Sequence, residues 1–264
     1  MKRSSGVRLC ATLAVSALSL ALVTGCSDGG SKDSPEGKGA DAAKPAAKAL
    51  SAAELKRLIL AKGDVTGYKV EPVEGGTPAK SKVKAADAQC DPLLRVMTGI
   101  APGTPAAETN RAVQEVKKAP TDKATSMDDL ADGKFEDTFK DSMDIDTTMV
   151  ILSSYDGDGA RQALRSVSDA MKACAGGFTG DQAGDKAKFT RVAEERPADA
   201  GDESVAFMAT SDMEDGDTAP VHVQVVRHGN NVASYMTINL GAMMTEKAYS
   251  VPAAVVKAQA AKLK

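Results

Sequence analysis

The chain has 264 residues, no tryptophan, and 36 acidic against 33 basic residues, which gives a formal net charge of −3 at pH 7. This balance, without a stripe of lysine and arginine, does not fit a nucleic-acid-binding protein. With only 4 tyrosines and 5 phenylalanines, aromatic platforms for sugars or bases are scarce as well. We therefore expect no nucleic-acid partner.

The N-terminus has the three parts of a secretory signal peptide. A basic start at residues 2–8 precedes an uncharged, mostly apolar stretch at residues 9–23, and small residues follow at 24–25. Fifteen helical residues extend about 22 Å, less than the roughly 30 Å hydrocarbon core of a membrane, which disfavours a spanning anchor. We therefore expect residues 1–25 to be removed on export.

Leu22-Val23-Thr24-Gly25-Cys26 resembles the lipobox of bacterial lipoproteins. The resemblance implies that Cys26 receives a diacylglyceryl group and becomes the new N-terminus. Two acyl chains hold a protein stably at a membrane, whereas one chain binds only marginally. The predicted partner is therefore the cell membrane, reached on its extracellular face through the Cys26 lipid anchor. An ordinary structural cysteine is the alternative, which its position directly after the apolar stretch disfavours.

Residues 26–50 are predicted to be a lipidated, flexible tether. Residues 27–49 contain no large apolar side chain, so they cannot bury enough surface to offset the entropy of ordering. Their root-mean-square reach is about 25 Å. Residues 51–264 are then predicted to form one domain, and without the 3 basic residues of the signal peptide the chain keeps 30 basic against 36 acidic residues.

The first half of this domain has few clear elements. Ser51-Ala52-Ala53-Glu54 predicts a capping box, and its helix is expected to end near Lys62-Gly63. A short strand is predicted at residues 68–73. Asp91-Pro92 predicts a helix start, with the aspartate as N-cap and the proline at the first helical position. Residues 98–110 are predicted to be a loop.

The second half is more strongly patterned. Residues 147–153 predict a buried strand, and a turn with a helix N-cap is expected at 156–159. The helix that follows, at about 160–174, has one apolar face that ends with Cys174. Shorter strands are predicted at residues 188–193 and 204–210.

Residues 221–239 are predicted to form a β-hairpin whose turn is either Gly229-Asn230 or Asn230-Asn231. Both registers place Val223 and Val225 on the same inward face. A C-terminal helix is predicted to start at Pro252 and to turn its apolar residues inward, namely Val256, Ala260 and Leu263. The elements together predict an α+β domain with a twisted antiparallel sheet covered by helices on one face.

Cys90 and Cys174 are the cysteines that remain unmodified after export, since Cys10 lies in the signal peptide and Cys26 carries the lipid. An even pair in an oxidising exterior predicts a disulfide. The chain-entropy model gives about 4.5 kcal/mol of stabilisation for the long loop that it closes. No CxxC pattern or nearby histidine would complete a metal site with this pair.

His222 and His228 are the only histidines of the chain. Both would project from the hairpin face opposite the valines, roughly 20 Å apart at 3.3 Å per residue, which is too far to share a metal ion or an active site. We interpret them as surface histidines of a strand and a turn. Because the GxSxG, HExxH and P-loop patterns are also absent, we expect no enzyme, no metal and no cofactor.

Residues 128–146 hold eight acids against Lys134 and Lys140. One interpretation is a calcium site or a docking surface for a basic partner. The other, which we favour because no EF-hand pattern is present, is a solvated amphipathic helix or loop with three apolar residues turned to the core, namely Phe135, Phe139 and Met143.

A series of local patterns also occurs in a familiar order, namely LSAAELKRLIL, CDPLL, SSYDGDGA, MKACAGGF, AGDESVAF, VVRHGNNVASY and VPAAVVKAQAAKL. This order resembles the sensor-type lipoproteins of actinobacteria that are related to the extracellular domain of the receptor kinase PknH. The resemblance covers about residues 51–264 and implies a twisted sheet flanked by helices, with a cleft for an unidentified ligand. A non-catalytic protein that binds a small ligand or envelope component is the leading hypothesis, and docking through the acidic segment is the alternative.

Overall fold

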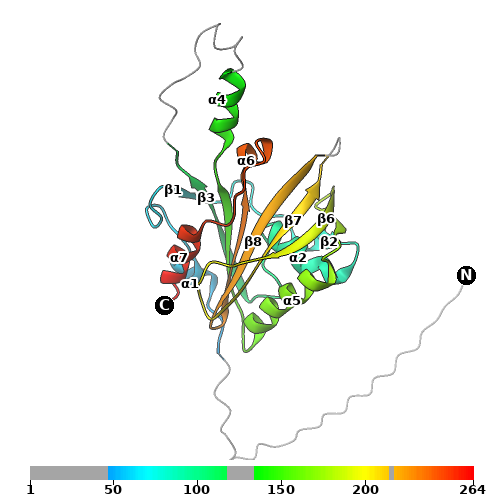
Figure 1. Ribbon diagram of the computed structural model, residues 1–264. Coiled ribbons are helices and arrows are strands. Elements are labelled where there is room, and N and C mark those ends of the chain that lie inside the picture. The colour runs from blue at the N-terminus through cyan, green and yellow to red at the C-terminus, as the bar shows by residue number, and fades with distance from the viewer. Residues whose placement is uncertain (1–46, 118–133, 214–216) are drawn as a thin grey trace, which may run out of the picture. The chain divides into compact units, whose positions relative to one another are not determined.

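The computed structural model describes residues 47–117, 134–213 and 217–264 (Figure 1). The predicted signal peptide, Cys26 and most of the predicted tether lie outside the described residues, as does the start of the acidic segment. The helices are α1 (Ala52–Leu58), α2 (Asp91–Met97), α4 (Lys134–Met143), α5 (Gly159–Ala173), α6 (Leu240–Met244) and α7 (Ala253–Ala261), with 3-10 turns η1 (Lys80–Lys82) and η2 (Ala88–Cys90). None of these helices is long and apolar enough to cross a membrane.

Nine strands form one sheet in the order β1-β3-β4-β9-β8-β7-β6-β5-β2, and every neighbouring pair is antiparallel. The strands are β1 (Tyr68–Glu71), β2 (Val83–Ala85), β3 (Ala107–Glu115), β4 (Thr147–Ser154), β5 (Phe178–Gln182), β6 (Asp185–Glu195), β7 (Glu203–Asp212), β8 (Thr218–His228) and β9 (Asn231–Ile238). The predicted α+β class with an antiparallel sheet is confirmed.

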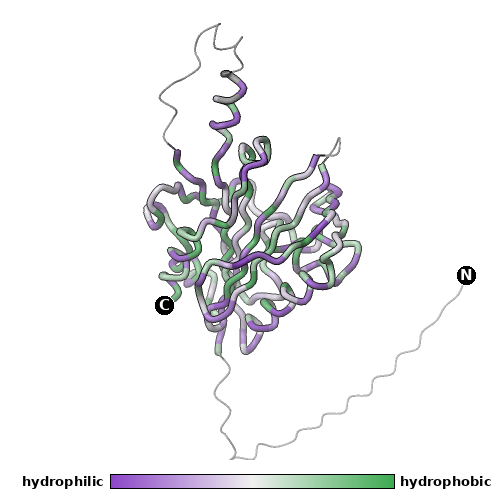
Figure 2. The backbone as a smooth tube through the Cα atoms, in the orientation of Figure 1, coloured by the Kyte–Doolittle hydropathy of each residue, from purple (hydrophilic) through white to green (hydrophobic). Residues whose placement is uncertain are grey.

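Helices cover both faces of this sheet, rather than one face as expected. Helices α2 and α5 lie on the face that carries Val223 and Val225, and α1 and α7 lie on the face that carries Val226 and Tyr235 (Figure 1). Side chains alternate between faces along a strand, and β8 and β9 have buried side chains at both sets of positions. In Figure 2 the central strands are accordingly rich in hydrophobic residues, whereas α4 is mostly hydrophilic.

The hairpin of β8 and β9 has the first of the two registers considered. His228 pairs with Asn231, which makes Gly229-Asn230 the two-residue turn, and Val223 pairs with Met236. Gly229 has a positive φ of 59°, a backbone conformation that glycine adopts without steric cost.

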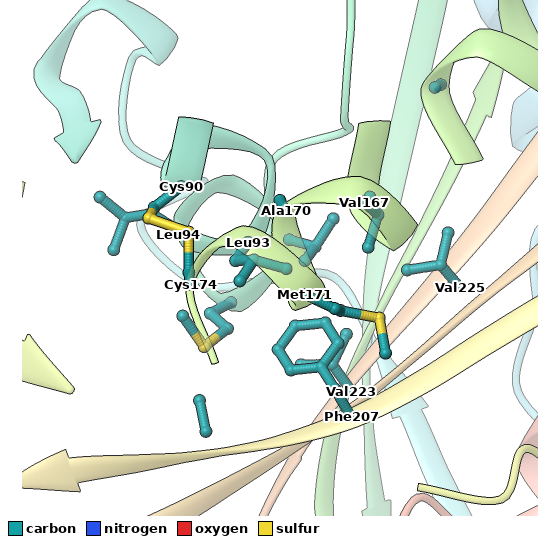
Figure 3. Close-up of a cluster of buried hydrophobic side chains, with 14 of the residues drawn as sticks. Cys90, Leu93, Leu94, Val167, Ala170, Met171, Cys174, Phe207, Val223 and Val225 are labelled. Atoms are coloured by element: carbon teal, nitrogen blue, oxygen red, sulfur yellow. A yellow bond between two sulfur atoms is a disulfide. The ribbon is translucent and has the colours of Figure 1, made fainter. Parts of the chain in front are cut away.

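The predicted disulfide is present and joins η2 to the residue that caps α5. The Cα atoms of Cys90 and Cys174 lie 6.0 Å apart, within the usual range of about 4.4–6.8 Å. Figure 3 shows the bridge at the edge of the core cluster, where Leu94 of α2 and Met171 of α5 also lie. The bridge therefore fixes the two helices that cover this face.

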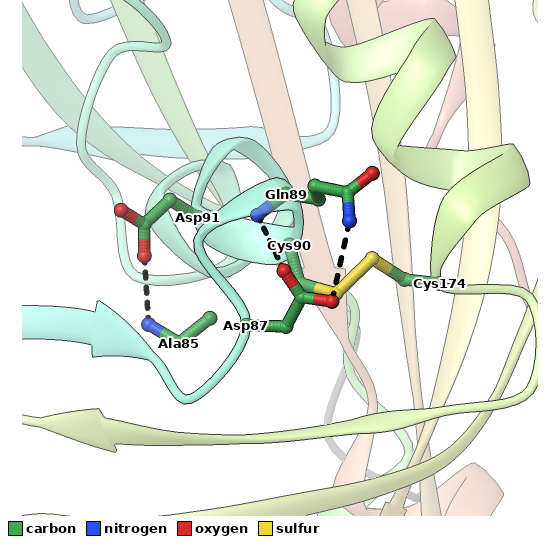
Figure 4. Close-up of a disulfide and its surroundings, with 6 residues drawn as sticks. All are labelled: Ala85, Asp87, Gln89, Cys90, Asp91 and Cys174. Atoms are coloured by element: carbon green, nitrogen blue, oxygen red, sulfur yellow. Dashed lines mark hydrogen bonds between the residues drawn. A yellow bond between two sulfur atoms is a disulfide. The ribbon is translucent and has the colours of Figure 1, made fainter.

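The start of α2 differs from the prediction. Cys90 occupies the N-cap position without a side-chain cap, and Asp91 is the first helical residue. The Asp91 carboxylate instead accepts a hydrogen bond of 2.7 Å from the backbone N–H of Ala85, and Asp87 caps the preceding turn (Figure 4). The aspartate thus connects the helix to the edge strand β2 rather than capping its own helix.

Two further boundaries were predicted wrongly. Helix α1 has the predicted capping box but ends at Leu58, not near Lys62-Gly63, and Ile59 has extended backbone angles. The predicted loop at 98–110 overlaps β3, because the side chains of this strand are mostly half-buried polar groups that give no strong alternation.

Candidate functional site

The two histidines differ in environment, and the surface interpretation of His222 is wrong. Only 5% of His222 is exposed, its Nδ1 lies 3.0 Å from both carboxylate oxygens of Glu195, and the Tyr249 ring packs edge-on at 4.4 Å. His228 is half-buried, and that burial lowers its pKa. The prediction failed because it assumed that the second face of β8 is exposed to solvent. The segment before α7, which includes Tyr249, covers this face at His222.

The acidic segment is partly described, and α4 accounts for residues 134–143. Phe139 is 48% exposed, so the expectation that it turns to the core is wrong. The Phe135 side chain lies outside the described part. Lys140 pairs with Glu136 at 2.6 Å, and Lys117 pairs with Asp144 at 3.1 Å, which makes this a solvated, ion-paired helix.

Within the described ranges, no group of three or more histidine, cysteine, aspartate or glutamate side chains is arranged to hold a metal ion. The turn at 156–159 serves a structural purpose instead. The Asp156 carboxylate accepts a hydrogen bond of 2.9 Å from the backbone N–H of Ala49, and Gly157 donates to the carbonyl of Ala47. The turn thereby fixes the point at which the chain enters the domain.

Three lysines line one hollow at the β2 end of the sheet. Here an open groove of about 530 Å³ extends over β2, β5 and β6 to the end of β7. We call it the lysine groove, and its charged and large apolar lining residues are Lys84, Asp181, Lys186, Lys188, Asp212 and Met213.

The strand register explains why these lysines share a face. Ala85, Gly180 and Ala187 are cross-strand neighbours, and their row faces α2, because a Cβ at Gly180 would collide with Leu94 of that helix. The adjacent row has the opposite orientation and consists of Lys84, Asp181 and Lys186. The small residues leave room for α2 on one face. Because side chains alternate along a strand, the charged residues between them point to the other, open face.

The turn between β5 and β6 holds the middle of this row in place. Ala183 and Gly184 both have positive φ angles, as a tight two-residue hairpin requires. The Asp181 carboxylate accepts a hydrogen bond of 2.7 Å from the Gly184 N–H and one of 2.8 Å from Lys186 Nζ. Mainly the Lys186 contact, and then the Gly184 contact, hold the pKa of Asp181 below its usual value, so this carboxylate is ionised at neutral pH.

The charges of the groove do not cancel. Lys186 pairs with Asp181, and Lys188 pairs with Asp212 at 2.6 Å. Lys84 is exposed and forms no ion pair with any residue that the structure describes. The lining therefore has one positive charge in excess, although the chain as a whole is acidic. Beside these charges, the half-exposed Met213 supplies an apolar contact.

Sequence reasoning missed the lysine groove. Its residues come from strands that are far apart in the sequence, and β2 and β5 were not predicted. The alternation in DKAKF at residues 185–189 is the one local signal, since it places Lys186 and Lys188 on one face of a strand. Lys84 joins them only through the pairing of β2 with β5.

No family model and no curated protein sequence matches the chain. Among solved structures, it is similar to the crystal structure of the extracellular domain of PknH from Mycobacterium tuberculosis. The two chains are 13% identical and superpose with a TM-score of 0.44, over 82% of this chain and 95% of the other. Values this low transfer no function from one chain to the other, so the resemblance to sensor-type lipoproteins stays a prediction.

Proposed function

We propose that this chain is an exported lipoprotein, anchored through Cys26 on the extracellular face of the cell membrane, whose non-catalytic domain binds a small anionic ligand or envelope component in the lysine groove. The observation that carries the binding proposal is the convergence of Lys84, Lys186 and Lys188 on one open groove of an acidic protein. The anchoring proposal rests on the lipobox-like sequence.

The ion pairs of the groove leave its lysines available to a ligand. The side chains of Lys186 and Lys188 are 83% and 63% exposed, and ion pairs this exposed stabilise a protein by about 0–1 kcal/mol. A carboxylate or phosphate ligand can therefore draw both lysines from their aspartate partners at little cost. Lys84 needs no such release, and Met213 is placed to contact an apolar part of the same ligand.

Reversing the charge of Lys84 and Lys188 together (Lys84→Glu with Lys188→Glu) is expected to abolish this binding. Each reversal replaces an attraction of about 1 kcal/mol with a repulsion of similar size, so the two together cost about 4 kcal/mol and affinity should fall about a thousandfold. The measurement is native mass spectrometry of the acylated protein purified from its own cells. Wild-type protein should carry a bound anionic molecule, and the variant should not.

Lys56→Glu with Lys62→Glu is the matched control, since it makes the same charge change at two exposed positions outside the groove. The control should retain the bound mass. A wild-type protein without any bound small molecule, or one whose bound mass survives in the double variant, would contradict the proposal.

Cys26→Ala tests the anchor separately. Without the sulfur no diacylglyceryl group can be attached, and we expect an uncleaved or misrouted protein that lacks the lipid mass. Two acyl chains are the physical basis of stable attachment, so the variant should also leave the membrane fraction. Intact-mass measurement and fractionation give the answer, and a mature wild-type protein with an unmodified Cys26 thiol would refute the anchor.

Docking of a protein through the acidic segment is the second candidate function. The observation that favours it is the exposure of Phe139 on α4 and of Leu240 and Met244 on the adjoining α6.

A further inference from the structure

Exposed apolar side chains gather at one end of the sheet. The structure describes five large apolar residues that are about half exposed or more, and four of them lie at or beside α4 and α6, namely Val116, Phe139, Leu240 and Met244. The fifth, Met213, belongs to the lysine groove. Isolated apolar residues are normal on a protein surface, but a concentration at one end is typical of an interaction site.

Close backbone packing joins the two helices that carry three of these side chains. A Cβ at Gly241 of α6 would collide with the backbone of Asp144 and with the Lys140 carbonyl at the end of α4. Phe139 and Leu240 are the residues directly before Lys140 and Gly241, so both flank this contact, and Met244 lies one turn after Leu240 on α6. We call Phe139, Leu240 and Met244 the distal surface.

Hydrogen bonds hold this arrangement in place. The Asn239 side chain caps α6 by accepting from the Ala242 N–H, and its Nδ2 donates to Asp144 and Asp146, at 2.9 Å in each case. Asn239 is only 4% exposed. Because one buried amide connects both helices to the start of β4, the distal surface is presented on a fixed support, which lowers the entropic cost of binding.

The chain enters the domain at the opposite end of the sheet. Leu50 donates a hydrogen bond to Ser154 Oγ, and Lys48 accepts one from Asn230, at the far ends of β4 and β9. Strand β4 runs from Thr147 beside α4 to Ser154, and 8 residues of strand extend about 26 Å. If the chain is anchored through residue 26, as proposed above, the distal surface lies at the end of the sheet opposite the point where the tether would join the domain.

The surrounding charge selects the kind of partner. Among the side chains that the structure describes at this end, carboxylates outnumber lysines, with Glu115, Glu136, Asp141, Asp144, Asp146 and Glu246 against Lys117, Lys140 and Lys247. A second copy of the chain would bring the same excess of negative charge, and an anionic membrane would repel it as well.

We propose that the distal surface docks an envelope protein whose contact region combines apolar side chains with an excess of lysine and arginine. Three half-exposed apolar side chains can form the centre of a small interface with a polar rim. Such interfaces are typical of transient complexes, whereas obligate interfaces are larger and more apolar. The acidic rim accelerates encounter with the basic partner, and the apolar centre slows its dissociation.

The test places a photoreactive phenylalanine analogue at position 139 of the full-length chain in its own cells. We expect a crosslink to one protein, at a peptide rich in lysine and arginine. Leu240→Ser with Met244→Ser should reduce the yield about tenfold, because two apolar contacts are lost. Glu136→Lys with Asp141→Lys, at side chains that are 69% and 64% exposed, should reduce it too.

Met213→Ser is the control for the loss of an exposed apolar side chain. Met213 is about as exposed as Leu240 and Met244 but lies in the lysine groove, so the crosslink yield should change by less than about twofold. All variants change exposed residues, and an unchanged melting temperature verifies their folding. Crosslinks only to a second copy or to lipid, a yield that the double variants leave unchanged, or no crosslink would each overturn the proposal. The two double variants at the distal surface lie outside the lysine groove and should leave the mass of any groove ligand unchanged, so this test is independent of the proposed groove function.

Discussion

Replacement of both Cys90 and Cys174 with alanine is expected to lower the melting temperature of the domain by several degrees. The disulfide closes a loop with a sequence separation of 84, for which the chain-entropy model gives about 4.5 kcal/mol. Even if about 2 kcal/mol is realised, a domain of this size should lose roughly 4–8 °C. Thermal unfolding followed by circular dichroism would measure the change.

The loss should be visible in a particular part of the molecule. Both cysteines are 3% exposed, and the bridge joins the α2 region to the end of α5. Strands β3 and β4 lie between these two helices in the sequence. Amide exchange should therefore increase first in η2 and α2, because the bridge ties Cys90, just before α2, to the end of α5. Added reductant should destabilise the wild type but leave the double variant unchanged. An equal melting temperature of wild type and variant would show that the bridge adds no stability.

Gln259→Ala is expected to destabilise the domain by about 3 kcal/mol. The side chain of Gln259, on α7, is fully buried, and its Oε1 accepts from the Leu60 N–H at 3.0 Å. Its Nε2 donates to the Leu58 carbonyl at 2.9 Å. The alanine variant leaves both backbone groups buried without a partner and opens a cavity between α1 and α7, and each of these effects costs free energy.

Gln162→Ala is the matched control for this change. Gln162 lies on the exposed side of α5, and its side chain donates to the Asp158 carboxylate at 2.9 Å, where water can replace the lost partner. Chemical denaturation should give a change below about 0.5 kcal/mol for the control. If Gln259→Ala lowered the free energy of unfolding by no more than the control, the Gln259 amide would contribute little to holding α7 against the end of α1.

Gln259 also explains why the end of α1 was not predictable from local sequence. Leu58, Ile59 and Leu60 continue an apolar helical pattern, and nothing before Lys62-Gly63 ends it. The helix stops at Leu58 because a glutamine about 200 residues later supplies the hydrogen bonds that another helical turn would have made. A tertiary contact of this length leaves no signal near the helix.

Patterned segments were predictable where one physical requirement dominates. The strand at 147–153 has an apolar centre at residues 149–152, α5 has a single apolar face, and the cysteine count indicated the disulfide. Strand β3 was missed because its side chains show no clear alternation. Its extended backbone is held by hydrogen bonds to β1 and β4, which the local sequence does not reveal. The covered second face of β8 was missed because alternation was taken to separate core from solvent, whereas here both faces carry helices.

The candidate sites were harder still to predict. The lysine groove depends on the pairing of β2 with β5, which follows from the order of strands in the sheet and not from any motif. Phe139 was expected in the core because its helical spacing from Phe135 and Met143 is amphipathic. The structure places α4 beyond the end of the sheet, where there is little core for that face to join (Figure 1).

The two edge strands of the sheet also bear on how the chain avoids self-assembly into fibrils. Strands β8 and β6 have 11 residues each and lie inside the sheet, whereas the edge strands β1 and β2 have 4 and 3 residues. Unpaired edges are templates for strand addition, and short or charged edges resist it. Lys69 and Glu71 on β1 and Lys84 on β2 are exposed charges on those edges. The apolar central strands β8 and β9, which could seed cross-β stacking, each pair with a strand on both sides, and the two strands at the edges of the sheet are short and charged.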